Sequence, residues 1–275
     1  MADIKINNIS MVFKKEDSSF TALDNINLDL KSGEFVSVIG PSGCGKTTLI
    51  DIIAGIRKPS SGEVLIDNNV VKKPSPEIGV VFQDYFLFPW MTAYENLYFA
   101  FKNTNDLNKS LNDDEIKDKA KKHLEIVGLS DFADTFPKAL SGGMRQRLAI
   151  SRMFGIDSKV FLMDEPFGAL DALNRMHMQD LLIYLWSNGN KKQTTLYVTH
   201  DVDESIFLSD KIIVMTPSHK IKEIIEVPFP RPRDRTRLNE DEKYLKLRNR
   251  ILSLLNEEMV IALNNQEEQA RRYYG

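Results

Sequence analysis

Three short apolar runs lie far apart along the chain, and each predicts a strand that is buried on both faces. Strands of this kind belong to parallel sheets with helices on both sides, so they form unbroken apolar runs rather than alternating patterns. A glycine or a polar residue follows each run at once. The three runs are residues 35–39, 160–163 and 195–198. We therefore expect an α/β fold with a mainly parallel sheet.

Helical spacing predicts further elements outside these strands. Residues 47–54 follow the first strand and predict a helix that ends near Gly55. A second helix carries one apolar face, made by Ile116, Ala120, Leu124 and Val127. A third, near the C-terminus, is marked in the same way by Leu247, Ile251, Leu254 and Leu255. We expect this last helix to pack on the core or on a neighbour, and the polar residues 103–114 to form a loop.

Length and composition set broad limits on the class of protein. The 275 residues allow one large domain or two modest ones, and the net charge of −3 gives no electrostatic reason to expect a nucleic-acid partner. The only cysteine, Cys44, has no partner for an internal disulfide, which fits a reducing compartment. No apolar run approaches the roughly 18 residues that span a bilayer, and the first residues lack a signal-peptide core. We therefore expect a soluble, cytoplasmic chain.

A glycine-rich loop joins the first predicted strand to the first predicted helix, as a phosphate-binding P-loop requires. Its glycines let backbone N–H groups turn toward an anion, and the helix N-terminus adds its positive dipole. We expect Lys46 to reach the β- and γ-phosphates of a nucleotide and the Thr47 hydroxyl to hold Mg²⁺. The alternative is a glycine-rich turn without a ligand. The predicted nucleotide-binding residues here are Gly40, Pro41, Ser42, Gly43, Cys44, Gly45, Lys46, Thr47 and Thr48.

Two carboxylates and a histidine follow the other two predicted strands. Asp164 and Glu165 come directly after residues 160–163, and His200 comes shortly after residues 195–198. Ligands bind at the carboxyl ends of strands in open α/β sheets. We expect Asp164 to hold Mg²⁺ through water, Glu165 to orient or deprotonate the attacking water, and His200 to contact the γ-phosphate. An ordinary acidic turn and a structural histidine are the alternatives.

A second loop with the character of an anion site occurs at residues 140–144, with the sequence Leu-Ser-Gly-Gly-Met. Ser141 is expected to cap the helix that follows, and Gly142 and Gly143 leave the N–H groups of its first turn accessible. The sequence contains no second P-loop. A phosphate at this loop therefore has to come from a partner.

With these loops, carboxylates and histidine in this order, the chain resembles the ATP-binding cassette (ABC) ATPases over almost its whole length. Its signature loop departs mildly from the family pattern, because Met144 stands where Gln is commonest. The resemblance implies further site residues: Phe13 as the aromatic that stacks on adenine, Gln83 as the glutamine that contacts Mg²⁺ or the water, and Asp171 in the D-loop. For Phe13, which stands where Tyr is usual, a place in the hydrophobic core is the alternative.

The resemblance also implies an organisation and a working unit. The expected fold is a P-loop NTPase (RecA-like) core with a mainly parallel sheet, an antiparallel β region and an inserted α-helical subdomain. Residues 1–87 and 156–230 are expected to form the ATP-binding core, residues 88–155 the helical subdomain, and residues 231–275 a C-terminal linker and helix. Two chains are expected to form a head-to-tail homodimer that binds ATP and Mg²⁺. In it, Ser141 and Gly143 of one chain close on the γ-phosphate held by Lys46 of the other.

Several details resemble importers among the ABC proteins. They are Pro166 after the carboxylates, Phe136 and Pro137 before the signature loop, and residues 87–92 and 228–234, which resemble the nitrate/sulfonate/taurine group. This implies separate membrane permease subunits, an extracytoplasmic solute-binding protein that acts indirectly, and a place at the cytoplasmic face of the membrane. The alternatives are an importer of another small solute, such as a thiamine precursor or a polyamine, and a soluble ABC ATPase of cluster assembly.

Two further segments each allow two interpretations. The aromatic residues 85–91 suit either a packed joint of the core or a groove that receives a permease helix, which in the family docks near residues 83–91. The arginine-rich residues 231–237 are expected to form a proline-spaced, solvated linker, with phosphate or lipid contacts as the alternative.

Overall fold

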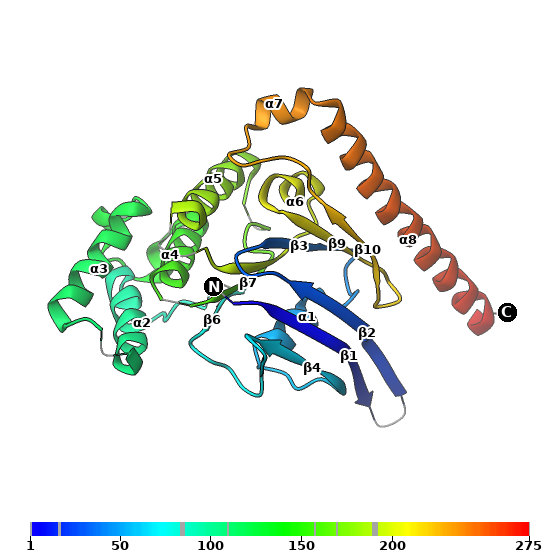
Figure 1. Cartoon of the computed structure of the whole chain (residues 1–275), viewed down its shortest axis with the longest axis horizontal. Helices are drawn as coiled ribbons and strands as arrows, with labels where there is room; N and C mark the ends of the chain where they lie inside the picture. The colour runs from blue at the N-terminus through cyan, green and yellow to red at the C-terminus, as the bar shows by residue number, and fades with distance from the viewer. Residues whose placement is uncertain are drawn as a thin grey trace.

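The computed structural model describes residues 2–15, 18–82, 86–108, 110–156, 158–168, 170–188 and 192–274, and these contain two β-sheets (Figure 1). The larger sheet has the strand order β10-β9-β3-β8-β7-β6, and its neighbouring strands are parallel except for β10 with β9. Its strands are β3 (Phe35–Ile39), β6 (Ile78–Val81), β7 (Val160–Asp164), β8 (Thr194–Val198), β9 (Lys211–Met215) and β10 (Ile221–Glu226). The smaller, antiparallel sheet has the order β2-β1-β4-β5 and contains β1 (Ile4–Lys15), β2 (Ser18–Leu30), β4 (Ser61–Ile66) and β5 (Asn69–Val70).

The three strands predicted from apolar runs are confirmed as β3, β7 and β8, and every residue in them is buried. Side chains alternate along a strand, so β3 sends Val36 and Val38 to one face and Phe35 and Ile39 to the other. The first face packs with α1 (Lys46–Ile53) and the antiparallel sheet. The second packs with α5 (Ala172–Asn188) and α6 (Val202–Leu208). Both faces are covered, which explains why these runs are apolar apart from buried Ser37 and Thr195, and the expected fold class is confirmed.

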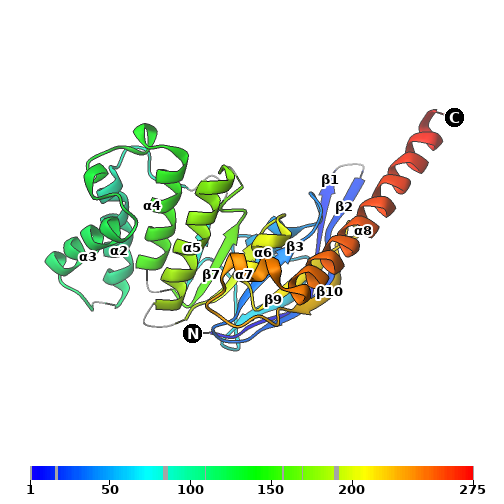
Figure 2. The ribbon, with the colours of Figure 1, turned by 90° about the horizontal axis from the view of Figure 1, so that it is seen from above.

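Three helices form a separate apolar cluster at one end of the large sheet (Figure 2). They are α2 (Ala93–Asn108), α3 (Asp113–Ile126) and α4 (Gly142–Gly155), and the short 3₁₀ helices Ser130–Phe132 and Pro137–Ala139 join α3 to α4. The predicted helix is confirmed as α3, in which Ile116, Ala120 and Leu124 are buried. All three helices lie within residues 88–155, which we propose as the helical subdomain.

The prediction of a loop over residues 103–114 was wrong for most of that stretch. The backbone of α2 continues to Asn108. Leu97 and Phe101 are buried and pack this helix into the apolar cluster that it forms with α3 and α4. Helix α3 begins at Asp113, where Asn112 and Glu115 form a capping box. Polar composition alone therefore failed to separate a loop from the polar ends of two helices.

The C-terminal segment is folded onto the core. The predicted solvated linker at residues 231–237 was wrong for Arg231 and Arg233, which are half-buried and donate hydrogen bonds to backbone carbonyls of residues 206–209. After α7 (Arg235–Glu240) comes the long α8 (Glu242–Tyr274). It packs Leu247, Ile251, Leu254 and Leu255 against the core, as its apolar spacing predicts, and it also buries Tyr244, which that spacing did not include. The helix then extends away from the body (Figures 1 and 2). Within the described residues, α8 and every other helix lack the length of apolar sequence that a membrane crossing needs.

We expect Gly155→Ala to destabilise the protein by about 1–3 kcal/mol, the usual cost of overpacking a core. A Cβ at Gly155 would lie 1.9 Å from Cζ of Phe101, whose side chain is buried in the helical cluster. Gly142→Ala, at the other end of the same helix, is the matched control because its Cβ would meet nothing within 4 Å. Chemical unfolding of both variants measures the difference. Equal stability of the two would contradict the close packing of α2 on α4.

Candidate active site

Three neighbouring parallel strands end at the same edge of the large sheet and deliver the predicted site residues there. In the ladder, Val38 of β3 pairs with Val198 of β8, and Val198 pairs with Asp164 of β7. The glycine-rich loop, His200 and Glu165 therefore follow directly from positions that lie side by side. Segments far apart in the sequence meet because the strands are parallel and in register.

The glycine-rich loop is wrapped around the Lys46 ammonium group. Lys46 Nζ donates hydrogen bonds to the carbonyl oxygens of Gly40 at 2.8 Å and Pro41 at 3.0 Å, and the residue is only 7% exposed. Gly45 caps α1 with a φ of 103°, and a Cβ there would lie 2.2 Å from the Ala22 carbonyl oxygen. A residue with a side chain is excluded at this position. The loop thus holds a buried positive charge next to a helix N-terminus, which is an environment that favours phosphate.

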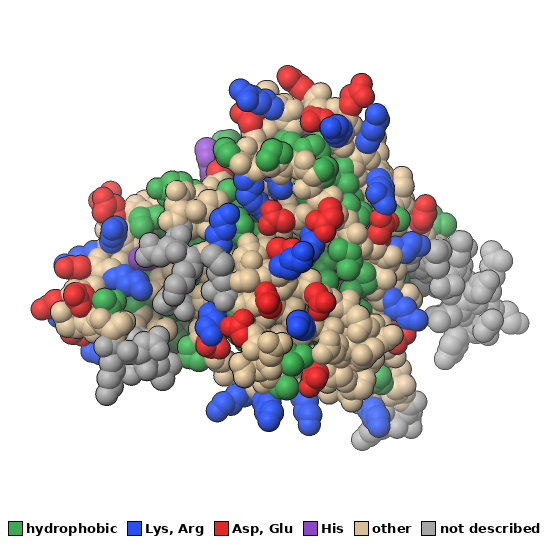
Figure 3. Space-filling view, viewed as in Figure 1, with side chains coloured by type: hydrophobic (Ala, Val, Ile, Leu, Met, Phe, Trp, Pro, Cys, Tyr) green, Lys and Arg blue, Asp and Glu red, His purple; other side chains and the backbone are tan. Residues whose placement is uncertain are grey.

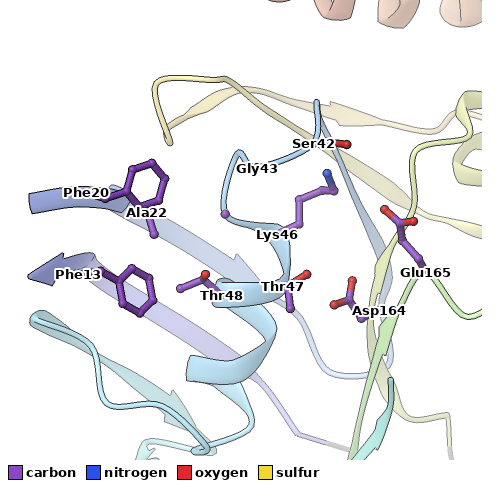
Figure 4. A pocket seen from close by; sticks show the side chains of 11 residues that line it. Phe13, Phe20, Ala22, Ser42, Gly43, Lys46, Thr47, Thr48, Asp164 and Glu165 are labelled. Carbon is purple, nitrogen blue, oxygen red and sulfur yellow. The ribbon is translucent and has the colours of Figure 1, made fainter. Parts of the chain in front are cut away.

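A pocket of about 540 Å³ opens beside this loop (Figure 4). Figure 4 shows its two ends: the rings of Phe13 and Phe20 lie together on one side, and Lys46, Asp164 and Glu165 lie on the other. The pocket therefore has an aromatic end and a charged end. It is lined by Phe13, Phe20, Ala22, Ser42, Gly43, Gly45, Lys46, Thr47, Thr48, Asp164 and Glu165.

Asp164 and Thr47 supply oxygen atoms at the charged end. Burial raises the pKa of the Asp164 carboxyl, and a hydrogen bond with the Thr47 side chain opposes that shift. A hydroxyl beside a buried carboxylate matches the oxygen ligands that Mg²⁺ takes when phosphates and water complete its shell. Among the described residues, this site included, no group of three or more His, Cys, Asp and Glu side chains is arranged to hold a metal by itself. The donor set therefore fits Mg²⁺ bound together with a nucleotide.

Glu165 and His200 face each other beside the pocket. His200 Nδ1 lies 3.2 Å from Glu165 Oε2, a hydrogen bond in which the ring N–H donates to the carboxylate. Glu165 has a φ of 45°, an uncommon backbone conformation for a residue other than glycine, and its N–H donates to the Val198 carbonyl oxygen at 3.0 Å. The backbone is thus held in a costly conformation that turns the carboxylate toward the pocket, as is common at active sites.

The aromatic end of the pocket is built on the hairpin of β1 and β2. Phe13 and Phe20 are direct cross-strand partners, and the Arg57 guanidinium lies 5.0 Å from the centre of the Phe13 ring. Phe13 is half-buried and belongs to none of the buried clusters, which argues against the core alternative. Our sequence reasoning missed Phe20, which is 52% exposed. The pairing of Phe20 with Phe13 across the hairpin is the feature that could have identified it.

The predicted signature loop caps α4 but does not line this pocket. The Ser141 hydroxyl accepts a hydrogen bond from the Met144 N–H at 3.2 Å, as expected for an N-cap. A Cβ at Gly142 would meet nothing within 4 Å, and one at Gly143 only the Leu170 side chain at 3.9 Å. Packing against the described residues therefore explains neither glycine.

Of the other predicted residues, Asp171 and Cys44 do not line the pocket. Asp171 precedes α5 and accepts hydrogen bonds from the backbone and side chain of Asn174, which lower the pKa of its carboxyl. Cys44 is buried under the loop, where burial raises the pKa of its thiol. Gln83 lies outside the described residues. Our sequence reasoning also missed buried Gln146 of α4, whose side chain donates to the Pro166 carbonyl oxygen, next to Glu165.

Comparison with known proteins agrees with this geometry. The profile of the family described as "ABC transporter" matches residues 23–168. The bicarbonate transport ATP-binding protein CmpD of Synechococcus elongatus is 42% identical over 91% of this chain and 89% of its own length. The aliphatic sulfonates import ATP-binding protein SsuB of Bacillus cereus is 44% identical over 90% of this chain and 94% of its own length.

Solved structures show the same similarity. A dimeric, post-hydrolysis structure of the ATP-binding cassette MJ0796, bound to ADP and Pi, superposes with a TM-score of 0.72 at 31% identity, covering 82% of this chain and all of that one. A second dimeric structure of that bacterial ABC transporter cassette superposes with a TM-score of 0.71 at 32% identity. With its P-loop, its paired carboxylates and these matches over most of its length, the chain belongs to the ABC transporter family, as one of its ATP-binding, ATP-hydrolysing proteins.

Proposed function

We propose that the chain is the ATPase subunit of an importer for a small oxyanion, and that two copies share two ATP sites. The observation that carries the proposal is the pocket itself: Lys46, Asp164 and Glu165 meet at one end of it and two aromatic rings at the other. The solute class is suggested by two relatives, since bicarbonate and sulfonates are both small oxyanions. This is also the group that residues 87–92 and 228–234 resemble.

Each end of the pocket has a role in this proposal. Phe13 and Phe20 stack on or flank the adenine ring, while the loop N–H groups and Lys46 bind the phosphates. Thr47 and Asp164 hold Mg²⁺, which neutralises charge on the phosphates when it is bound. Glu165 orients the attacking water and accepts its proton. His200 fixes the Glu165 carboxylate through the 3.2 Å contact and presents its ring toward the γ-phosphate.

The second copy is needed to complete each site. The part of the chain that the structure describes gives Gly142 and Gly143 no steric reason to be glycine, while the first-turn N–H groups of α4 suit a phosphate. Close approach of a second copy and its nucleotide to this loop would account for both the glycines and the accessible N–H groups. In a head-to-tail homodimer, Ser141 and Gly143 of one copy would contact the γ-phosphate held by Lys46 of its partner. Each ATP would then stabilise the closed dimer through its differential affinity for that state.

The permease is proposed to dock on the aromatic segment that follows residue 85. Trp90 is 69% exposed and Phe86 61% exposed, although the backbone between them is firmly held. The Asn96 side chain accepts from the Phe88 N–H at 2.8 Å and donates to the Met91 carbonyl oxygen at 3.0 Å. Exposed aromatic rings on an ordered backbone are typical of interaction surfaces. Docking to a permease would hold the chain at the cytoplasmic face of the membrane.

The surface offers no strong reason to propose a nucleic-acid partner. On the face shown in Figure 3, acidic and basic side chains are interspersed, apart from a row of basic ones along the lower edge. The net charge of the chain is −3. Nucleic-acid sites instead depend on a coherent basic stripe.

We expect Glu165→Gln to bind ATP but to hydrolyse it about 100- to 10,000-fold more slowly, the range found when a general base is lost. The amide keeps the shape of the side chain and cannot accept the proton. ATPase assays and size-exclusion chromatography with ATP should show closed dimers that accumulate. Glu63→Gln, an exposed position on β4, is the control and should turn over normally. Normal turnover of Glu165→Gln would disprove the role of Glu165.

We expect Ser141→Arg to reduce hydrolysis by at least about 100-fold while ATP still binds to the same chain, because an oxyanion-type contact is lost. The bulky side chain would block the approach of the partner's γ-phosphate. Nucleotide binding and turnover are measured separately, with Ser130→Arg on the exposed surface of the same helical region as the control. If binding and hydrolysis fell together, the loop would be acting within its own chain.

We expect Trp90→Ala to uncouple transport from hydrolysis. Removing a centrally placed aromatic side chain from an interface typically costs about 2 kcal/mol or more of binding energy. Basal ATPase activity and the unfolding midpoint should stay unchanged, because this ring is mostly exposed, while solute uptake by the assembled transporter should fall. Tyr184→Ala, at a 60% exposed ring on α5, is the matched control. An equal loss of folding and uptake would support the packed-joint interpretation instead.

A further inference from the structure

Helix α6 begins two residues after His200, and its position determines where the histidine lies. Asp201 caps the helix, with its side chain accepting from the Glu204 N–H at 3.0 Å. The helix has only seven residues and six of them are buried. A helix this short is not stable by itself, because forming the first turn is costly. Its place therefore depends on contacts with other elements.

The C-terminal segment holds the far end of α6. Arg233 Nη1 donates to the carbonyl oxygens of Ile206 at 2.8 Å, Phe207 at 3.0 Å and Ser209 at 2.7 Å. Arg231 donates to the Leu208 carbonyl oxygen at 2.6 Å. These carbonyls have no partner within the helix, and a positive charge at a helix C-terminus is favourable. Burial, with the nearby Arg231, lowers the pKa of Arg233 to about 10, so it stays charged at neutral pH.

Helix α8 holds the beginning of α6. The Asp203 carboxylate oxygen Oδ1 accepts from the Tyr244 hydroxyl and from Arg248 Nε, each at 2.7 Å. Both donors come from the first turns of α8. The C-terminal segment thus binds α6 at its first turn and at its last.

A buried group of polar side chains joins α6 to the residue before His200. Glu204 is 5% exposed and accepts from Gln179 Nε2 at 2.8 Å and from the Thr199 hydroxyl. The Thr199 hydroxyl oxygen also accepts from the Asp201 N–H at 3.1 Å. Residues 199 and 201, on either side of His200, are therefore fixed to α6. A shift of the helix would move the histidine with it.

We propose that Arg233 and Tyr244 are positioning residues that hold His200 against Glu165 through α6. Neither residue lines the nucleotide pocket, and each contacts a different end of the helix. The inference rests on the proposed role of His200 in hydrolysis. It assigns to the C-terminal segment a task in the reaction, although the segment is far from the P-loop in sequence.

The kinetic test uses Tyr244→Phe, which removes one hydroxyl, and Arg233→Gln, which removes the guanidinium group that donates to the backbone carbonyls of α6. We expect each to lower kcat for ATP hydrolysis about ten-fold, since misplacement by about 1 Å can cost 100-fold. KM for ATP should change by less than about two-fold, because the phosphate-binding loop is untouched. Tyr184→Phe and Arg237→Gln, at exposed positions, are the matched controls. Both should keep the kcat and KM of the unsubstituted protein.

A second readout observes the histidine directly. The chain has four histidines, so the ring signals of His200 can be assigned in NMR spectra by comparison with His200→Ala. We expect Tyr244→Phe to move this signal and Tyr184→Phe to leave it in place. If Arg233→Gln fails to fold, the kinetics and the His200 signal of Tyr244→Phe alone test the proposal.

An unmoved His200 signal would overturn the inference, as would unchanged kcat or a KM that rises as kcat falls. Full activity of His200→Ala would instead remove the proposed role of His200 in hydrolysis. The NMR result would then still show whether the C-terminal segment positions the ring. The two failures are therefore distinguishable.

Discussion

The parallel register of β3, β8 and β7 is the constraint on which the rest of the site depends. Because Val38, Val198 and Asp164 lie side by side in the ladder, the loop, the histidine and the carboxylates all follow from one edge of the sheet. The side chains on the two faces of these strands keep the register, since a one-residue slip would exchange the side chains of two differently packed layers. The same burial that stabilises the core thus brings the charged residues together.

The site has features that packing among the described residues does not explain. The P-loop, Asp164 and Glu165 share a pocket, whereas Gly142 and Gly143 lie outside it. A Cβ at Gly142 would meet none of the described residues within 4 Å, and one at Gly143 only Leu170 at 3.9 Å. Helix α4 nevertheless connects to the segment that follows Glu165, because buried Gln146 donates to the Pro166 carbonyl oxygen. In the proposed dimer, this bond would link a phosphate of the partner's ATP to the backbone beside Glu165.

The half-buried arginines Arg231 and Arg233 show how the fold accommodates charge that is largely removed from water. Burial lowers the pKa of both. Backbone carbonyls accept hydrogen bonds from both guanidinium groups, although Arg231 Nε is buried without a hydrogen-bond partner among the described residues. Arg231 also lies 4.8 Å from the centre of the Trp186 ring and 2.9 Å from an Asp210 oxygen. A segment rich in proline and arginine can therefore be an ordered part of the core.

The sequence alone was sufficient to predict the elements that are specified by residues adjacent in the chain. The apolar runs predicted β3, β7 and β8, and contiguous residues around Lys46 predicted the phosphate loop, because a strand, a glycine turn and a helix start are specified by neighbouring residues. Phe20, Gln146 and the half-buried Arg233 were not predicted, and neither were the helical ends within residues 103–114. Their roles arise from hairpin register, helix packing and carbonyls offered by distant segments, and these partners are neighbours only after the chain has folded.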